Sequence, residues 1–226
     1  MSKVALITGA NRGIGLELCR LYVDLGYEVV AVCRESSEEV EDVADQVISG
    51  VDLTHDDAID NVVQVLNMTL GEDAQIDVLI NNAGVFHNET LDDMNFDTIR
   101  AQFEVNAIAP LKVSHAMIPF LKEGSKIANI TSRMGSVEDN SSGAYYGYRA
   151  SKAALNAMGK SLAIDLKGKG VAVAMIHPGF VQTRMVAFNG DITAQQAASG
   201  IAKRIEELTL DTTGGFWHSN GESLPW

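Results

Sequence analysis

Cysteine is scarce in this chain of 226 residues. It has two, Cys19 and Cys33, which are too few for a disulfide framework, and their spacing matches no zinc motif. Cys19 falls on the apolar face of an expected helix, and Cys33 ends an expected strand. We interpret both as buried, unreactive thiols, as is typical of proteins from a reducing compartment.

Positive charge is also scarce, because 17 Lys and Arg residues stand against 30 Asp and Glu residues, for a net charge of −13. Proteins that bind nucleic acid need clustered positive charge against the phosphates, so this composition argues against such a partner. It remains compatible with a small anionic ligand in a local basic pocket. His115 has no partners at metal-ligand spacing, and we expect no metal site.

Long apolar runs are absent from the sequence. A helix that spans a membrane needs ~20 predominantly apolar residues, and no run reaches that length. Residues 1–3 precede the first expected strand and leave no room for a signal or transit peptide. We therefore expect a cytoplasmic protein without a membrane partner.

The length and the 46% hydrophobic content fit one globular domain over residues 1–226. Short apolar runs alternate with segments of helical periodicity, which predicts an α/β fold with a doubly wound parallel sheet of about seven strands. Strands are expected at residues 4–8, 28–33, 46–51, 76–80, 126–131 and 171–176, with a seventh within 214–226. Helices are expected at residues 14–25, 36–43, 96–121, 150–166 and 194–208, with one more after a cap at Thr54.

A glycine-rich turn, with Gly9, Gly13 and Gly15, joins the first strand to the first helix. Glycine lets the main chain approach a pyrophosphate closely. The helix behind the turn offers unpaired N–H groups and the positive end of its dipole. This strand–turn–helix context predicts a dinucleotide site, and the alternative is a tight turn without a ligand.

The end of the second strand favours NADP(H) over NAD(H). A ribose 2′-hydroxyl is usually held by a carboxylate at this point, whereas a 2′-phosphate is held by arginine. Position 33 holds no carboxylate, Arg34 follows it, and Arg12 lies in the glycine turn. The alternative is that Arg34 is a surface residue whose charge balances the acidic residues of 35–39.

Tyr148 and Lys152 are four residues apart at the start of an expected helix, so they share one face. A nearby positive charge lowers the pKa of a phenol, and a tuned tyrosine can exchange a proton with a carbonyl or an alcohol oxygen. Ser132, at the end of the fifth expected strand, offers a hydroxyl for the same oxygen, although Thr131 and Ser136 also qualify. The alternative is an amphipathic tyrosine beside a solvated lysine.

Several motifs, in this order, resemble those of the short-chain dehydrogenase/reductase family. They are Thr8-Gly9-x-x-x-Gly13-x-Gly15, Asn81-Asn82-Ala83-Gly84, Asn129-Ile130-Thr131-Ser132 and Tyr148-x-x-x-Lys152. The resemblance covers nearly the whole chain and implies a single-domain Rossmann-type sheet. Residues 143–152 and the tail that ends in tryptophan are most similar to the sniffer/C-factor-like carbonyl reductase branch. The interval from Ser132 to Tyr148 is longer than in the family's usual form.

The resemblance implies a catalytic set of Asn106, Ser132, Tyr148 and Lys152. Tyr148 would donate the proton, Ser132 would bind the oxyanion, and Lys152 would lower the pKa of Tyr148 and reach the nicotinamide ribose. Asn106, at a local irregularity of its helix, would hold a water near the lysine. The implied cofactor-binding residues are Gly9, Asn11, Arg12, Gly13, Ile14, Gly15, Arg34, Asp52, Leu53, Asn82, Ala83, Gly84, Tyr148, Lys152, Pro178, Gly179, Val181 and Thr183.

Two of these cofactor contacts have plainer alternatives. Asp52 would otherwise only precede Thr54, the expected cap of the next helix. Residues 81–84 would otherwise form an ordinary Asn-rich turn. Their side-chain amides can also tie neighbouring loops together. Residues 185–193 are expected to form a substrate lid.

The sequence therefore predicts an NADPH-dependent oxidoreductase that reduces a ketone or aldehyde carbonyl to an alcohol, with a small-molecule substrate. We expect a homodimer or homotetramer that pairs through residues 103–121 and 150–166. One alternative is an NADP(H)-binding signalling or sensor protein with little turnover. Another is an epimerase or dehydratase, which the glycine spacing and the short carboxyl-terminal part disfavour.

Overall fold

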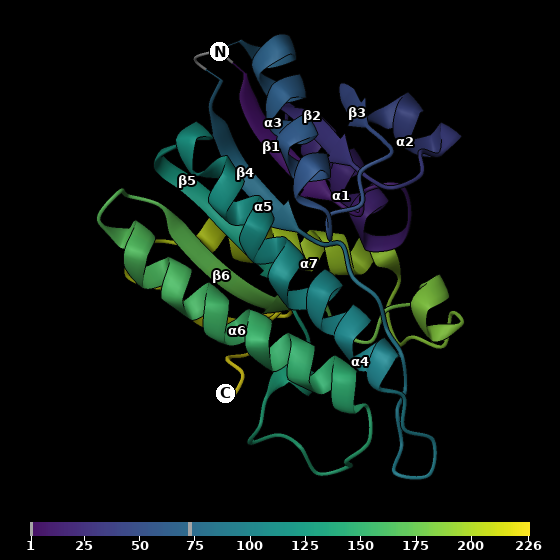
Figure 1. The fold of residues 1–226 in the computed structure, drawn as a ribbon. Helices are drawn as coiled ribbons and strands as arrows, with labels where there is room; N and C mark the ends of the chain where they lie inside the picture. Colours follow the sequence, from purple (N-terminus) through teal and green to yellow (C-terminus); the bar gives the residue numbers. More distant parts are fainter. Residues whose placement is uncertain (1, 72–73) are drawn as a thin grey trace.

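The computed structural model describes residues 2–71 and 74–226, so Met1 lies outside the described residues. Its centre is a parallel sheet in the order β3-β2-β1-β4-β5-β6-β7 (Figure 1). The strands are β1 (Lys3–Thr8), β2 (Tyr27–Val32), β3 (Gln46–Ile48), β4 (Ile76–Asn81), β5 (Leu121–Ile130), β6 (Ala172–His177) and β7 (Gly215–His218). The predicted fold class, a doubly wound α/β sheet, is confirmed.

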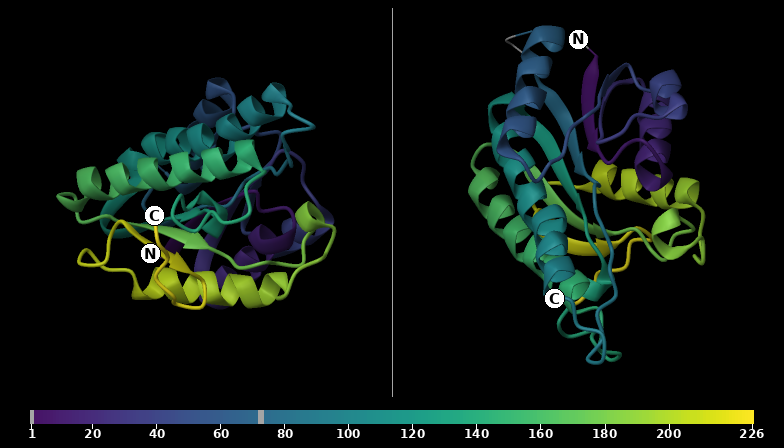
Figure 2. Two further views of the ribbon diagram at one scale, coloured as in Figure 1. Left: turned by 90° about the horizontal axis from the view of Figure 1, so that it is seen from below. Right: turned by 45° about the vertical axis from the view of Figure 1, so that its right-hand side comes forward.

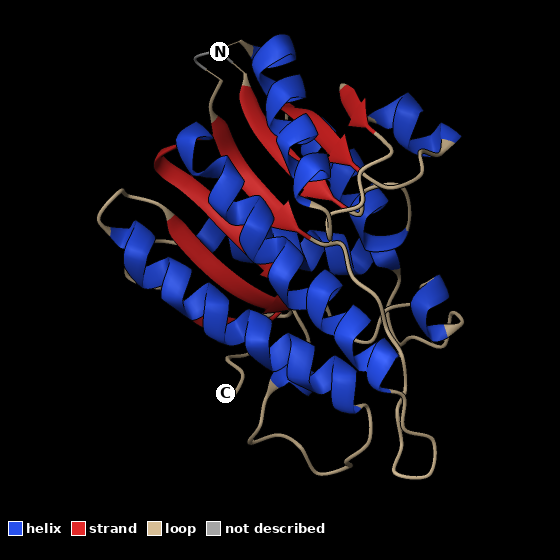
Figure 3. Ribbon diagram, viewed as in Figure 1, coloured by secondary structure: helices blue, strands red, loops and turns tan. Residues whose placement is uncertain are grey.

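Helices cover both faces of the sheet (Figures 2 and 3). They are α1 (Gly13–Asp24), α2 (Glu38–Val43), α3 (Asp56–Leu70), α4 (Phe96–Phe103), α5 (Ala109–Met117), α6 (Tyr146–Lys167) and α7 (Ala194–Glu207). Four short helical turns complete the structure: η1 (Glu104–Ile108), η2 (Ile118–Phe120), η3 (Arg133–Gly135) and η4 (Arg184–Val186).

The central strand β1 is apolar from Val4 to Ile7, as expected for a sheet that is buried on both faces. Alternate residues of β1 enter two different cores, Leu6 on one face and Ile7 on the other. The first core joins the sheet to α3, α5 and α6, and the second joins it to α1 and α7. A parallel sheet needs such layers because each crossover places a helix on a face.

The strand order reverses beside β1, which pairs with β2 on one side and with β4 on the other. The loops that follow these strands therefore diverge and leave a crevice at the carboxyl ends of the strands. In open α/β sheets ligands bind at this point. Both predicted motifs, the glycine turn after β1 and residues 81–84 after β4, lie there.

Several predicted boundaries are wrong. The third strand ends at Ile48 rather than at residue 51, and Thr54 is not the cap of α3, because His55 holds that position without a side-chain bond. The helix expected over residues 96–121 is interrupted by the π-helical turn η1 and ends in the 3-10 turn η2, after which β5 begins at Leu121. Among the described residues, no helix combines the length and apolar character needed to cross a membrane.

Candidate active site

The glycine turn after β1 packs against the loop after β4 too closely for side chains. A Cβ added to Gly9 would lie 2.8 Å from the Ala83 Cα, and one added to Gly15 would lie 2.2 Å from the Gly9 carbonyl oxygen. Gly9 and Gly13 also adopt φ angles of +65° and +55°, which L side chains rarely tolerate. The sequence therefore needs glycine at these positions to form this turn.

The amino-terminal end of α1 is open toward the crevice. Its N-cap residue, Arg12, makes no side-chain capping bond, and its first turn holds no acidic residue. The first N–H groups of a helix have no partners within the helix, so this end can bind an anion. The observation fits a pyrophosphate on the glycine turn.

Asn82 and Thr8 tie the ends of β4 and β1 together. The Asn82 side-chain amide donates to the carbonyl oxygens of Thr8 and Gly9 at 3.0 and 3.1 Å. The backbone N–H groups of Asn82 and Ala83 donate to the Thr8 hydroxyl at 3.0 and 3.2 Å. Residues 81–84 are therefore not an ordinary turn, and the expectation that their amides tie neighbouring loops together is confirmed.

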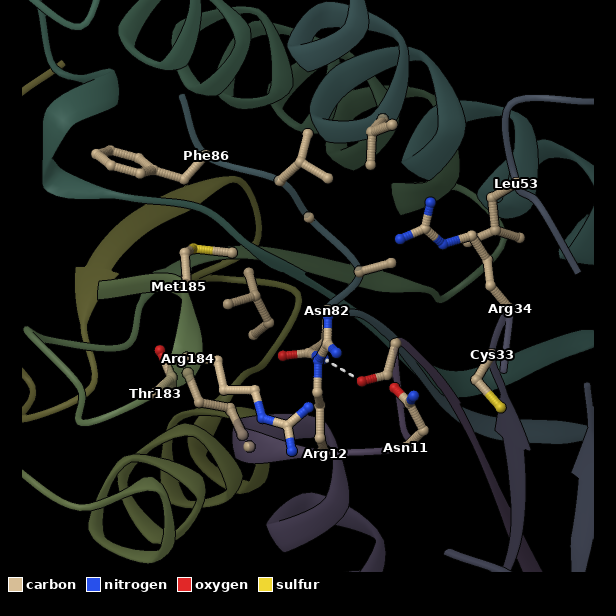
Figure 4. Close-up of a pocket in the computed structure, with 18 of the residues that line it drawn as sticks. Asn11, Arg12, Cys33, Arg34, Leu53, Asn82, Phe86, Thr183, Arg184 and Met185 are labelled. Carbon is tan, nitrogen blue, oxygen red and sulfur yellow. Dashed lines mark hydrogen bonds between the residues drawn. The ribbon is translucent and has the colours of Figure 1, made fainter. Parts of the chain in front are cut away.

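A cavity of about 700 Å³ runs along the carboxyl edge of the sheet. Figure 4 shows Arg34 and Leu53 at one end, and Phe86 and Met185 at the other. Of the expected site residues, the cavity is lined by Gly9, Asn11, Arg12, Gly13, Ile14, Arg34, Asp52, Leu53, Asn82, Ala83, Gly84, Tyr148, Lys152, Pro178 and Thr183.

Three expected cofactor residues do not line this cavity: Gly15, Gly179 and Val181. The expected catalytic residues Asn106 and Ser132 do not line it either. Gly15 lies beneath the glycine turn, and Val181 is buried with 5% of its surface exposed. These residues shape the backbone near the crevice rather than its walls. The cavity is also lined by residues that were not predicted from the motifs, among them Val85, Phe86, Gln182 and Arg184.

Arg12 and Arg34 bring two positive charges to the cavity. Among the described residues, neither forms an ion pair within 4.0 Å, so Arg34 is not held by the acidic residues of 35–39. Asp52 accepts hydrogen bonds from the Thr54 N–H and hydroxyl at 3.0 and 2.8 Å, and these bonds lower the pKa of its carboxyl. Asp52 therefore shapes its loop while it also lines the cavity, and the Thr54 cap of the plainer alternative is not present.

Tyr148 and Lys152 lie together in the first turns of α6, as the spacing predicts. The Lys152 Nζ is 5.8 Å from the centre of the Tyr148 ring and donates to the Ile130 carbonyl oxygen at 2.9 Å. Burial lowers the pKa of Lys152 to about 8. The ammonium is therefore still mostly protonated at neutral pH.

The predicted lowering of the Tyr148 pKa by Lys152 does not occur in this structure. Burial raises the pKa of Tyr148 to about 12, and an interaction with the Ser132 hydroxyl offsets part of that rise. Removing the phenolate from water outweighs the other influences on this group. Tyr148 therefore keeps its proton at neutral pH, which suits a proton donor.

Ser132 follows β5 directly and is nearly buried, with 6% of its surface exposed. Its hydroxyl oxygen accepts a hydrogen bond from the Met134 N–H at 3.1 Å. Of the three hydroxyls that the sequence left open, Ser132 is the one that influences the pKa of Tyr148.

Asn106 lies in the π-helical turn η1, where the resemblance places a local irregularity. Its side chain is fully engaged with the loop after β4: the Oδ1 atom accepts from the Val85 N–H at 2.8 Å, and the Nδ2 group donates to the Val85 carbonyl oxygen at 2.9 Å and to the Ser151 hydroxyl at 3.1 Å. Asn106 thus joins the helix to the cavity wall. Its role in holding a water stays a prediction.

Residues 185–193, the expected lid, contribute Met185 and Phe188 to the rim of the cavity. The segment is tied down at its base, where the Gln182 N–H donates to the Ile192 carbonyl oxygen at 2.9 Å and its side chain to Gly190 at 3.0 Å. Met185 and Phe188 are exposed at 44% and 63% of their surfaces. They offer apolar contacts at the end of the cavity beyond Tyr148.

Residues 3–194 match the model of the short chain dehydrogenase family, which covers the glycine turn, the crevice and α6. The chain belongs to the short-chain dehydrogenase family. It is therefore a member of an oxidoreductase family, as predicted. In the part of the chain that the structure describes, no three potential metal ligands lie together.

Two curated relatives show where the chain falls within this family. It is 37% identical over 225 residues to 1-hydroxy-2-glutathionyl-2-methyl-3-butene dehydrogenase of Rhodococcus sp. strain AD45, a match that covers 98% of each chain. It is 39% identical over 154 residues to C-signal of Myxococcus xanthus, a match that covers 67% of this chain and 93% of the relative.

Two solved structures share the whole fold. Carbonyl reductase Sniffer of D. melanogaster superposes with a TM-score of 0.91 at 28% identity and full coverage of both chains. The NADPH-bound carbonyl reductase from chicken fatty liver superposes with a TM-score of 0.90 at 27% identity, covering 100% of this chain and 99% of the other. The predicted resemblance to the sniffer/C-factor-like branch is confirmed.

Proposed function

We propose that this chain uses NADPH to reduce the carbonyl of a ketone or an aldehyde to an alcohol. One observation carries the proposal: a single cavity joins the glycine turn and two arginines to Tyr148 and Lys152. This arrangement lets one elongated ligand place its phosphates on the turn and its reactive end beside the tyrosine. The similarity to carbonyl reductases supports the same reaction.

The residues of the cavity fit NADPH. The glycine turn leaves room for a pyrophosphate beside the open end of α1, and Arg12 and Arg34 would meet a 2′-phosphate. Bound NADPH supplies the hydride for the carbonyl carbon. The solved carbonyl reductase from chicken fatty liver, which is described as NADPH-bound, supports this choice.

Three side chains handle the proton and the charge of the carbonyl oxygen. Tyr148, which is protonated at neutral pH, donates its proton to that oxygen. Ser132 donates a hydrogen bond to the developing oxyanion, a contribution of about 3 kcal/mol at comparable sites. Lys152 places a positive charge 5.8 Å from the centre of the Tyr148 ring, in the cavity where the oxyanion forms.

Replacing Tyr148 by Phe tests the proposal. We expect turnover to fall by at least about a hundredfold, because general acid catalysis contributes roughly 10²–10⁴-fold. NADPH affinity should stay nearly unchanged, because the ring still packs edge-on against Phe86. The measurement is NADPH oxidation against a panel of aldehydes, ketones and quinones, with fluorescence titration of NADPH on both proteins.

Two outcomes would contradict this assignment. Full turnover in Tyr148→Phe would remove Tyr148 as the proton donor. Loss of turnover together with loss of NADPH binding would indicate that Tyr148 holds the fold rather than the proton.

The similarity to C-signal favours a second candidate, an NADP(H)-binding signalling protein with little turnover. A pure sensor has no need for Asn106, Ser132, Tyr148 and Lys152 together, and this argues for the enzyme. Tight NADPH binding without turnover on any carbonyl of the panel would shift the balance to signalling. Assembly into dimers or tetramers and a cytoplasmic location stay predictions.

A further inference from the structure

We propose that Glu89 is a positioning residue that fixes the amino-terminal end of α6 and thereby the place of Tyr148. The proposal rests on the proposed function, because it assigns a purpose to the exact placement of that hydroxyl. Glu89 lies in the loop after β4 and belongs to none of the motifs. It is nevertheless buried, with 1% of its surface exposed.

The first turn of α6 lacks a cap of its own. Tyr145, its N-cap residue, has the left-handed φ of 54° and makes no side-chain capping bond. Glu89, far away in the sequence, supplies the missing acceptors. Its Oε2 atom accepts from the Gly147 N–H at 3.0 Å, and its backbone carbonyl accepts from the Tyr145 N–H at 2.9 Å. A carboxylate also suits the positive end of the helix dipole.

The other carboxylate oxygen ties the same group to α4. Oε1 accepts from the Gln102 side-chain amide and from the Thr98 hydroxyl, both at 2.7 Å. Gln102 in turn accepts from the His87 N–H at 2.9 Å. A buried carboxylate is costly unless its acceptors are used, and here both oxygens are used. One side chain therefore joins α4, α6 and the loop after β4.

The contacts of Glu89 with α4 and α6 leave little room for movement around Tyr148. A Cβ on Gly147 would lie 2.5 Å from the Gln102 side-chain nitrogen and 2.9 Å from the Ile99 Cα, so α6 packs directly on α4 just before the tyrosine. From the same loop as Glu89, the Phe86 ring meets the Tyr148 ring edge-on, with 5.0 Å between centroids. Releasing the Gly147 N–H would let the first turn of α6 shift, and displacements near 1 Å can cost about a hundredfold in rate.

The substitution Glu89→Gln tests the proposal. Glutamine has the same size but only one acceptor oxygen, so it cannot serve α4 and the Gly147 N–H together. We expect kcat to fall at least about tenfold, with the dissociation constant for NADPH changed less than about twofold. The backbone N–H groups of residues 145–149 should exchange their hydrogens with solvent at least about tenfold faster. This measurement does not depend on turnover.

Thr98→Val is the matched control. It removes one hydrogen bond from the same carboxylate but leaves the Gly147 N–H paired, so kcat and the exchange of residues 145–149 should stay within about twofold of wild type. If Glu89→Gln does not fold, Gly147→Ala replaces it, because its Cβ displaces the helix end while Glu89 remains; the same fall in kcat is expected.

The outcomes separate this proposal from the proposed function. Wild type without turnover on any carbonyl overturns the function, and the exchange experiment still decides the role of Glu89. Unchanged exchange and unchanged kcat in Glu89→Gln overturn the positioning role. Equal losses in Thr98→Val and Glu89→Gln would also overturn it, because the effect would then belong to the network's stability and not to the end of α6.

Discussion

Arg12 and Arg34 are the side chains that we expect to decide the choice of cofactor at this site. Both line the cavity without an ion pair among the described residues, and both approach it from loops that begin at strand ends. A guanidinium binds phosphate through several N–H donors that are held in a fixed geometry. It makes fewer and weaker hydrogen bonds to a ribose hydroxyl, which carries no charge. We therefore expect both charges to favour a cofactor that carries a 2′-phosphate.

Replacing Arg34 by Ala should weaken NADPH binding by roughly ten- to a hundredfold, because a hydrogen bond to a charged group contributes about 1.5–3 kcal/mol. Binding of NADH, which lacks the 2′-phosphate, should change little. Fluorescence titration of both cofactors measures the difference. Arg20→Ala is the control, since Arg20 pairs with Glu17 on α1. Equal losses for the two cofactors would show that Arg34 does not read the phosphate.

At the residue scale, sequence reasoning found the groups that belong to motifs and missed Glu89. Tyr148, Lys152 and the glycines have a fixed spacing whose chemistry can be stated without coordinates. Glu89 has no such spacing, because its partners lie 9, 13 and 58 positions away. A charged residue in an expected loop is normally solvated, so only the folded arrangement reveals its burial.

Between elements, the contact of η3 with α6 sets the distance from Ser132 to Tyr148. Gly135 allows this contact, since an added Cβ would lie 2.8 Å from the Lys152 carbonyl carbon and 3.0 Å from the Ala153 nitrogen. The loop that begins at Ser132 therefore rests directly on the backbone of the helix that carries the tyrosine.

We expect Gly135→Ala to separate these two elements, with a loss of about 1–3 kcal/mol in the free energy of unfolding from overpacking. Turnover should fall further than the loss of folded protein explains, because Ser132 and Tyr148 move apart. Urea unfolding and kcat measure the two effects. Gly168→Ala serves as the control, because an added Cβ there meets nothing within 4 Å. A stable Gly135→Ala variant with wild-type kcat would contradict the prediction.

The helix predicted over residues 96–121 shows why element boundaries are hard to predict. The π-helical turn η1 changes the backbone hydrogen bonding while the chain remains helical, so the apolar periodicity hardly changes. The end of the helix depends on η2, which contains Pro119, and on the pairing of Leu121 with Ile76 in the sheet. Such pairing is decided by residues far away in the sequence.

For the whole molecule, NADPH should raise the thermal stability of the folded state. A ligand that binds only the folded chain at 100 times its dissociation constant adds about 2.7 kcal/mol. For a chain of this size that corresponds to a rise in Tm of roughly 5–10 °C. Differential scanning fluorimetry checks this, with NADH at the same concentration as the comparison. The same rise with both cofactors would contradict a preference for NADP(H).

The architecture as a whole was the most predictable level. Short, mainly apolar strands that alternate with amphipathic helices allow few arrangements other than a parallel sheet with two helical layers. The cavity follows from the same topology, since the ends of β1 and β4 diverge. Part of its wall was not predicted, because Phe86 and Gln182 come from segments without a repeating pattern, whereas Met185 belongs to the predicted lid.

The position of β1 inside the sheet also bears on how the chain is made. One neighbour, β2, ends at Val32, but the other, β4, ends at Asn81. At about 5–20 residues per second, a ribosome needs roughly 2–10 s to pass from one to the other. During that interval the first strand exposes an unpaired, apolar edge, which chaperones or neighbouring nascent chains can bind.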